Sequence, residues 1–425
     1  MKATIGVPKF SELGLLPGLV ECLDKAGIKL PTSIQSQVIP SVLPFKHHHL
    51  FTAQTGTGKT LAYMLPTLHL LKSQELAQKK PLTMPLSPRA LVIVPNRELT
   101  MQLEDVMKLF KHNVRLKALG VMSGQKWGIE EKELREGVDL VFGTPDRIEK
   151  HIKNGTMQIG KLAHLVVDET DTLLDAGYSK YIKTLTSLDT KFTFVSATFP
   201  KHMQDFISKH YSFNQGHNLP YIKKFIEAKT HLNLSHLKHE FIQLKEYDKN
   251  PSFLQKLQEI HSSVRASGCM VFCNSIQSAR ATQHFLNGNG FEAVSLHGEI
   301  PPKRRLEYIE KFKSKKAHYL VCTDLASRGL DFPFIKYVIQ YDFPKTVSDY
   351  VHRAGRTGRA GSSGTVITFY RNKNYPVIKE LQTSYEKNKP LNITSSAFSA
   401  KNKEMIFKQK QTPQQKLSDL LKKHK

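Results

Sequence analysis

The sequence predicts an α/β protein made of two consecutive domains. Short apolar runs rich in β-branched residues alternate with amphipathic helical patterns, which is typical of parallel sheets covered by helices on both faces. The alternation is interrupted by an irregular stretch around residues 210–236 that contains Gly216 and Pro220, and it then starts again. A chain of 425 residues is long enough to give each of two domains a full core.

The expected strands fall into two sets. Those of the first domain are Leu50–Ala53, Ala90–Val94, Leu116–Val121, Leu140–Phe142, His164–Val167 and Phe192–Ser196, and helices such as Arg97–Phe110 lie between them. Those of the second are Cys269–Phe272, Ala293–Leu296, Tyr319–Cys322, Tyr337–Gln340 and Thr365–Phe369. We therefore predict a first domain at 1–215, a linker at 216–235, a second domain at 236–395 and a basic tail at 396–425. The lysines of the tail are either a solvated end or an arm that adds phosphate contacts.

The composition limits the class of protein. A formal net charge of +25 predicts binding to a polyanion, most readily a nucleic acid, although a solvated Lys-rich surface is the alternative. No apolar run reaches the ~20 residues needed to cross a bilayer, so no membrane partner is expected. The first ten residues resemble neither a secretion signal nor a mitochondrial transit peptide. Four cysteines make no disulfide framework, which indicates a reducing compartment.

The most specific segment is a phosphate-binding loop that follows an apolar run and precedes a helical pattern. It reads Ala53, Gln54, Thr55, Gly56, Thr57, Gly58, Lys59, Thr60. Small residues let backbone N–H groups surround a polyphosphate, Lys59 supplies a positive charge, and the Thr60 hydroxyl suits Mg²⁺. The general pattern has glycine in the first position, where this chain has Ala53.

An acidic cluster ends the strand at His164–Val167. Such a cluster is often only a solvated strand end, but carboxylates at the carboxyl edge of a parallel strand face the place where these sheets bind ligands. With a phosphate loop in the same domain, Asp168 is predicted to hold Mg²⁺ and Glu169 to orient the attacking water.

An arginine-rich segment in the second domain, His352–Arg359, is poor material for a core, so we expect it to have a function. Arginines three residues apart, on a segment broken by glycines, suit the stabilisation of charge on a transferring phosphoryl group. If they act on a nucleotide bound to the first domain, the two domains must close for catalysis. For Arg353, contact with an RNA phosphate is the rival interpretation.

These motifs together resemble the DEAD-box ATP-dependent RNA helicases, from about Phe10 to Tyr370. Residues 27–35 resemble the Q motif of that family, set within 8–36, with Phe10 seventeen residues before Gly27. The family's phosphate loop begins with alanine, which accounts for Ala53, and Asp168–Asp171 stands at its namesake box with Thr170 in place of alanine. The resemblance implies two tandem RecA-like domains, each a parallel sheet flanked by helices.

The resemblance also implies a set of site residues. Besides the phosphate loop, the nucleotide contacts are Phe10 on the adenine face, Gln35 on the adenine edge and Asp331 on the ribose. The predicted metal ligands for Mg²⁺ are Thr60 and Asp168, and the predicted arginine fingers are Arg356 and Arg359. Ser196 and Thr198 are expected to couple hydrolysis to strand separation. The predicted RNA contacts are Arg97, Gly124, Thr144, Arg147, Arg305 and Thr323.

The function implied is an ATP-dependent RNA helicase that couples hydrolysis to RNA binding and to local unwinding of short duplexes. RNA would be held by its backbone with little regard to sequence, and we expect a monomer, with ribonucleoprotein or pre-ribosome proteins as further partners.

Four stretches (Asp168–Asp175, Ser196–Pro200, Cys322–Asp331 and Tyr341–Pro344) are similar to mitochondrial members linked to large ribosomal subunit assembly. An intracellular location is expected, mitochondrial slightly ahead of nucleolar or cytoplasmic. An ATP-gated RNA clamp and a DNA translocase on the same core are the rival functions.

Overall fold

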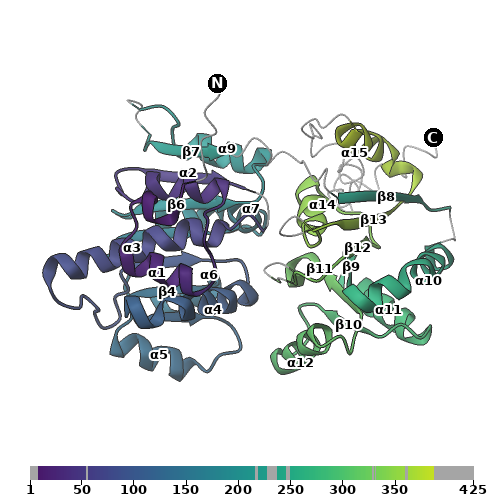
Figure 1. The fold of residues 1–425 in the computed structure, drawn as a ribbon, viewed down its shortest axis with the longest axis horizontal. Helices are drawn as coiled ribbons and strands as arrows, with labels where there is room; N and C mark the ends of the chain where they lie inside the picture. Colours follow the sequence, from purple (N-terminus) through teal and green to yellow (C-terminus); the bar gives the residue numbers. More distant parts are fainter. Residues whose placement is uncertain are drawn as a thin grey trace, which may run out of the picture.

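The computed structural model describes residues 8–53, 56–215, 219–226, 237–245, 249–327, 330, 332–358 and 362–386. Two lobes stand side by side, one built from the amino-terminal half of the chain and the other from the carboxyl-terminal half (Figure 1). Each contains one parallel sheet flanked by helices, which confirms the predicted α/β class and its two tandem units.

The first sheet has the strand order β3-β4-β2-β5-β6-β1-β7, with every pairing parallel. Its strands are β1 (His48–Thr52), β2 (Ala90–Ile93), β3 (Ala118–Val121), β4 (Leu140–Gly143), β5 (His164–Val167), β6 (Lys191–Ser196) and β7 (Ile222–Ile226). The helical segments are η1 (Phe10–Leu13), α1 (Pro17–Lys25), α2 (Ser33–Val42), α3 (Lys59–Gln78), α4 (Arg97–Val114), α5 (Trp127–Glu136), α6 (Pro145–Lys153), α7 (Thr170–Asp175), α8 (Ser179–Thr186) and α9 (Lys201–His210).

The second sheet has the order β10-β11-β9-β12-β13-β8, again parallel throughout. Its strands are β8 (Leu237–Gln243), β9 (Cys269–Cys273), β10 (Ala293–Leu296), β11 (Tyr319–Thr323), β12 (Tyr337–Gln340) and β13 (Gly364–Tyr370). The helical segments are α10 (Lys249–Ser267), α11 (Ile276–Gly288), α12 (Pro302–Lys313), α13 (Asp324–Ser327), α14 (Val347–Ala354), η3 (Asn372–Asn374) and α15 (Tyr375–Glu386).

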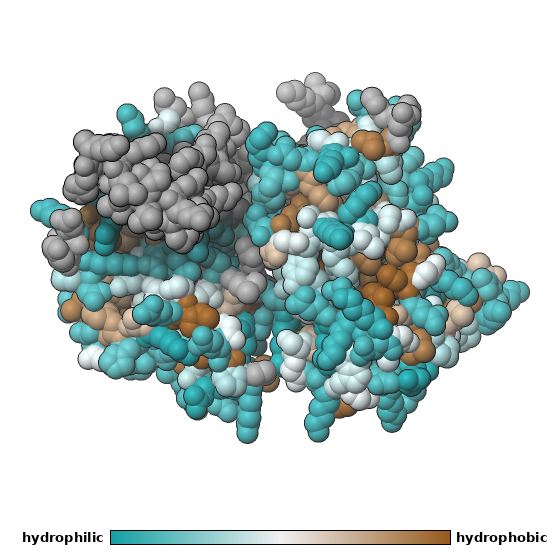
Figure 2. Space-filling view, turned by 180° about the vertical axis from the view of Figure 1, so that it is seen from behind, coloured by the Kyte–Doolittle hydropathy of each residue, from teal (hydrophilic) through white to brown (hydrophobic). Residues whose placement is uncertain are grey.

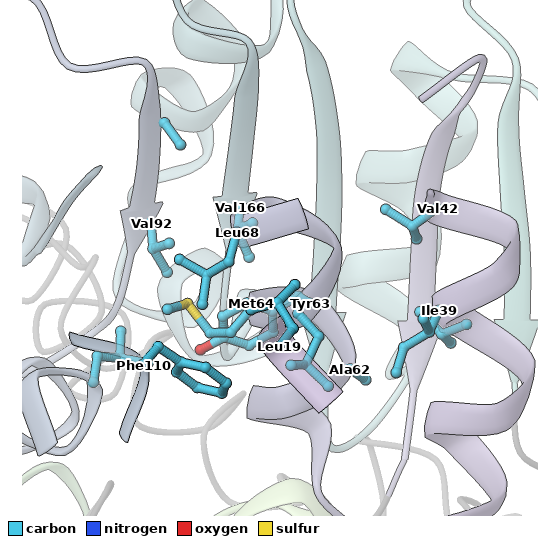
Figure 3. Packing of buried hydrophobic residues seen from close by; sticks show 14 of the residues in the cluster. Leu19, Ile39, Val42, Ala62, Tyr63, Met64, Leu68, Val92, Phe110 and Val166 are labelled. Atoms are coloured by element: carbon cyan, nitrogen blue, oxygen red, sulfur yellow. The ribbon is translucent and has the colours of Figure 1, made fainter. Parts of the chain in front are cut away.

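Both faces of each sheet are buried, which explains why the strands read as continuous apolar runs. In the first domain, α1–α4 pack on one face, where Tyr63 and Met64 of α3 meet Val92 and Val166 of the sheet (Figure 3). Helices α5–α9 cover the opposite face. In the second domain, α12–α15 and α10–α11 cover the two faces in the same way.

The boundary of the predicted linker needs a correction. Strand β7 lies inside the segment assigned to the linker at 216–235, yet it pairs with β1 and extends the first sheet. Being an edge strand with Lys223 and Lys224 in its middle and only Ile222 fully buried, it lacks the apolar run that identifies a central strand. Strand β8 was also not predicted. The basic tail at 396–425 lies outside the described residues.

Candidate functional site

The phosphate loop joins the end of β1 to the start of α3. Gly56 and Gly58 have φ values of 82° and 85°, a left-handed conformation that favours glycine. A methyl group at Gly58 would stand 2.3 Å from Nε2 of Gln35, so this position also needs the absence of a side chain. Gln54 and Thr55 lie outside the described residues. The loop therefore has the turn that phosphate cradling requires, and α3 begins at Lys59 with its amide groups towards the loop.

Lys59 is held across the loop. Its Nζ donates a hydrogen bond of 2.7 Å to the carbonyl of Ala53, whose own N–H donates to Ser196 on the neighbouring strand β6. The residue keeps some exposure, but its ammonium group lies deep, and burial lowers the pKa of Lys59 to about 8, against the pull of three carboxylates nearby. A polyphosphate would add further negative charge around this cation.

The carboxylates lie where β5 ends. Asp168 is 5 % exposed; burial, followed by the charge of Glu169, raises the pKa of Asp168 to about 6. The hydroxyl of Tyr63 donates to Asp168 Oδ2 at 2.9 Å. The sequence analysis missed Tyr63, although it stands four residues after Lys59 and so on the same face of α3.

The backbone at Glu169 has φ 45° and ψ 49°, a left-handed conformation that costs a non-glycine residue roughly 1–2 kcal/mol. Its amide donates to Asp168 Oδ1 at 2.7 Å, and this bond helps to hold the turn. The hydroxyl of Thr170, the residue in the alanine position of the family, donates to the Val167 carbonyl at 2.7 Å.

Asp171 connects three predicted motifs. Thr198 Oγ1 donates to its Oδ2 at 2.5 Å, the Thr198 amide donates to Ser196 Oγ at 3.4 Å, and His352 Nε2 of the second domain lies 3.4 Å from the same carboxylate. Burial alone would raise the pKa of Asp171, but His352, Thr198 and Ser196 hold it well below its usual range. The predicted coupling residues therefore meet the second domain at a buried charge.

A second contact joins the domains. Arg305 Nε lies 2.5 Å from Glu98 Oε1, and both side chains are largely buried. Another nitrogen of Arg305 donates to the Ala326 carbonyl at 2.9 Å. The structure thus places Arg305 at the domain junction, in an ion pair that the sequence did not indicate. Its assignment as an RNA contact stays a prediction, and so does that of Thr323, the last residue of β11.

Arg356 and Arg353 of the arginine-rich segment lie in different surroundings. Arg356 is 4 % exposed, its Nη1 donates to the Leu330 carbonyl at 2.8 Å, and its charge reaches across the junction to lower the pKa of Lys59. Arg353 is fully buried, with a bidentate pair to Asp324 at 2.6 and 2.7 Å and a bond to Asn274, so the structure favours a packing role for it over contact with an RNA phosphate. Arg359 and Asp331 lie outside the described residues.

The predicted adenine contacts lie beside the phosphate loop. Gln35 is 2 % exposed; its amide accepts from Thr32 N at 2.9 Å and donates to the Gly58 carbonyl at 3.0 Å. Phe10 is buried in the same core as α2 and α3. These contacts connect the Q motif to the loop, and the adenine assignments stay predictions.

The predicted RNA contacts of the first domain gather on three neighbouring loops. Arg97 donates to the Ser123 carbonyl at 3.2 Å, next to the exposed Gly124, and Arg147 donates to the Gln125 carbonyl at 3.2 Å. Thr144 precedes α6 as its N-cap residue. These predicted RNA contacts, distant in sequence, therefore lie close together in the fold.

A buried carboxylate supports this surface. Glu130 is fully buried, and it accepts from Arg147 Nε at 2.8 Å, from the Met122 amide at 3.0 Å and from the His151 ring at 2.9 Å. It therefore fixes the loop before α5 against α6. Sequence reasoning missed it because a glutamate on a helix reads as a solvated residue.

The described residues contain no group of three or more His, Cys, Asp or Glu placed to hold a metal ion. Mg²⁺ is commonly held by one or two carboxylates together with the phosphates of a substrate. The buried Asp168 next to the phosphate loop fits that arrangement. No helix in the described part of the chain has the length and apolarity to span a bilayer.

Comparison with known proteins gives two family matches. Residues 32–206 match the model described as DEAD/DEAH box helicase, and residues 252–361 match the helicase conserved C-terminal domain. The chain is 36 % identical over 399 residues to the DEAD-box ATP-dependent RNA helicase 39 of Arabidopsis thaliana. The match covers 91 % of this chain and 62 % of that protein. It is 32 % identical to the human protein named probable ATP-dependent RNA helicase DDX28, over 85 % of this chain and 69 % of that one.

Solved structures share the fold. Dbp5 of S. cerevisiae bound to RNA and ADP BeF3 matches with a TM-score of 0.75 and 25 % identity, over 88 % of this chain and 93 % of that one. The helicase Mss116 bound to ssRNA and UDP-BeF has a TM-score of 0.77 at 20 % identity, over 91 % and 78 %. The chain spans 62 % and 65 % of the length of the first two sequence relatives.

Proposed function

Because the chain belongs to the DEAD-box ATP-dependent RNA helicases, we propose that it hydrolyses ATP when RNA is bound and uses the cycle to separate short RNA duplexes. The observation that carries the proposal is the junction between the domains. Asp171 of the box meets His352 of the arginine-rich segment, and Glu98 meets Arg305. Motifs that are incomplete in one domain are thereby completed by the other.

The nucleotide would lie between the phosphate loop and the carboxyl end of β5. Backbone amides of the loop and Lys59 bind the phosphates, Glu169 orients the attacking water, and Arg356 with Arg359 offsets the charge that develops on the transferring group. Gln35 and Phe10 bind the adenine, and Asp331 binds the ribose. Thr60 and Asp168 would hold Mg²⁺, which supplies charge neutralisation at the phosphate oxygens.

RNA would bind across both domains. Arg97, Gly124, Thr144 and Arg147 contact the backbone from the first domain, and Thr323 contacts it from the second. Since ATP and RNA both bind the closed arrangement, each must raise the affinity of the other by the same factor. Hydrolysis removes one of the two supports, and RNA is released.

The experiment that tests the proposal is a steady-state ATPase assay with and without single-stranded RNA. We expect RNA to stimulate turnover in the natural chain and Lys59→Ala to abolish it. Full RNA-stimulated turnover in that variant would refute the site. Single-stranded DNA of the same length is the matched ligand, because preference for RNA requires contacts to the 2′-hydroxyl; equal stimulation by DNA would favour the translocase.

A strand-displacement assay on a short duplex separates unwinding from clamping. An ATP-gated clamp hydrolyses ATP and holds RNA yet releases no strand. A role in ribosome assembly, with pre-ribosome proteins as partners and a mitochondrial location, is a further part of the proposal, supported by the likeness of four stretches to mitochondrial members. Crosslinking the protein to RNA in cells and sequencing the bound transcripts tests it. Mitochondrial ribosomal RNA is the expected result, and other transcripts would overturn this part alone.

A further inference from the structure

Trp127 is the only tryptophan of the chain and begins α5, three residues after Gly124. It is only partly buried, and among the described residues it packs into none of the four hydrophobic clusters of the two domains. This large aromatic side chain thus lies outside every core and beside predicted RNA contacts.

Three side chains of helix α6 contact the indole. His151 stacks on it with ring centroids 4.0 Å apart and planes 8° from parallel. The cationic groups of Arg147 and Lys150 each lie 4.9 Å from the ring centroid. Residues 147, 150 and 151 share one face of α6, because they are three and four apart. The three partners therefore belong to α6, and the part of the ring that stays exposed can contact another planar group.

The support of the ring is rigid. The His151 ring is fully buried and bonded to Glu130 at 2.9 Å and to Thr156 at 2.8 Å. The indole N–H donates to Glu131 at 3.0 Å, which fixes the direction of the ring. A ring held flat in this way loses little freedom when it stacks on a ligand.

Resting on the proposed function, we propose that Trp127 stacks on one unpaired base of the bound RNA, next to the backbone contacts of Gly124 and Arg147. Lys126, the residue before Trp127, and Lys150 of α6 are exposed. They supply positive charge for the adjoining phosphates. The cationic surroundings favour a polyanion over an apolar peptide. Every base has a stacking face, so this contact adds affinity with little sequence preference.

The lone tryptophan gives a direct readout with the full chain. Oligo-U is trimmed to the shortest length that still binds, so that it takes one register, and is bound with 2-aminopurine at successive positions in the presence of a nonhydrolysable ATP analogue. We expect the 2-aminopurine emission to be quenched strongly at one position and not at its neighbours, and Trp127→Ala to remove that quenching. Uniform quenching along the oligonucleotide, or quenching that persists in the variant, would overturn the proposal.

Affinity gives the second measurement. Trp127→Ala should weaken RNA binding roughly 5- to 150-fold, since stacking on an aromatic is worth about 1–3 kcal/mol per base. Trp127→Phe keeps an aromatic against His151 and should lose less. An RNA with an abasic site at the quenched position should bind the natural chain as weakly as intact RNA binds Trp127→Ala, and the two changes together should cost no more than either alone. Additive losses would contradict stacking.

Controls separate the possible failures. Tyr375→Ala removes an aromatic that is 49 % exposed on the second domain and should leave RNA affinity unchanged. Thermal unfolding of each variant reports whether it folds. If the natural chain binds RNA but Trp127→Ala binds equally well, only the stacking proposal fails. If the natural chain binds no RNA, the proposed function itself fails.

Discussion

At the scale of single residues, the proposed catalytic cluster depends on groups that lie four positions apart or across a turn. Tyr63 reaches Asp168 because it lies one helical turn after Lys59, so one helix would bind the phosphates and support the carboxylate. The hydroxyl opposes the rise in the pKa of Asp168 that burial causes. Removing it should favour the protonated acid, which holds Mg²⁺ poorly.

We therefore expect Tyr63→Phe to raise the Mg²⁺ concentration needed for half-maximal ATPase at pH 7 by roughly 2- to 15-fold, because a hydrogen bond to a charged group is worth about 1.5–3 kcal/mol and Asp168, with a pKa of about 6, is mostly ionised at that pH. The defect should shrink as the pH rises. Tyr319→Phe is the matched control, since it also removes a buried tyrosine hydroxyl, bonded to His261 in the second domain. An unchanged Mg²⁺ dependence in Tyr63→Phe would show that the bond has no part in holding the metal.

Arg356 is predicted to act on the transition state. Arg356→Ala should slow RNA-stimulated turnover by about 10³-fold or more, in line with other arginine fingers, and leave the dissociation constant for ATP close to that of the natural chain. Single-turnover hydrolysis and equilibrium binding of a fluorescent ATP analogue measure the two quantities. Equal losses in both would make Arg356 a ligand of bound ATP.

At the scale of elements, the central strands bury polar side chains as well as apolar ones. His164 begins β5 and is 1 % exposed, with Thr67 of α3 and Thr193 of β6 each 2.9 Å from a ring nitrogen. Burial lowers the pKa of His164 to about 3. The ring is therefore neutral in the folded protein, and it bridges a helix and two strands in that form.

The pH dependence of stability follows with a definite sign. In the unfolded chain His164 takes up a proton near pH 6.5, whereas in the folded protein it does so only near pH 3. The free energy of unfolding should fall as the pH drops below 6.5, by up to about 1.4 kcal/mol per pH unit from this residue.

Urea unfolding at pH 7 and pH 5 measures the effect. His164→Met should be less stable than the natural chain at pH 7 and should show a flatter pH dependence. His284→Asn, at an exposed position of α11, should change neither quantity. If His164→Met kept the full pH dependence, the titrating group would lie elsewhere.

Single residues and secondary-structure elements differ in how far the sequence predicts them. The alternation of strands and helices fixes the end of the sheet at which Lys59 and Asp168 lie, so their meeting was predictable. The reach of Tyr63, the three partners of Glu130 and the burial of Arg353 depend on how helices pack, which no local pattern records. Strand β7 was not predicted because an edge strand needs no continuous apolar run.

At the scale of the whole molecule, the two lobes are joined where their motifs meet. Figure 2 shows a largely hydrophilic surface with a furrow between the two halves in the lower part of the view. The pair of Glu98 and Arg305 is largely buried at the junction. Such a pair favours the closed arrangement only when both members are present.

We expect Glu98→Gln, Arg305→Gln and the double variant to reduce the factor by which RNA raises the affinity for an ATP analogue. Loss of one member should reduce it about 5- to 150-fold, the range of ordinary coupling energies, and the double variant should lose no more than the worse single one. Fluorescence titrations with and without RNA measure the factor. The pair of Arg280 and Glu299, about half exposed within the second domain, is the control and should not affect it. Independent losses at Glu98 and Arg305 would argue against a shared contact.

The buried Asp171 has one further consequence. Its carboxylate is fully enclosed, with the His352 imidazole from the other lobe beside it. Parting the lobes takes that imidazole away and leaves the carboxylate with its partners from the first domain alone, so water must enter to replace the lost contact. A small cationic molecule that occupied the vacated imidazole position would hold the enzyme apart, and this gives inhibitor design a target outside the nucleotide pocket.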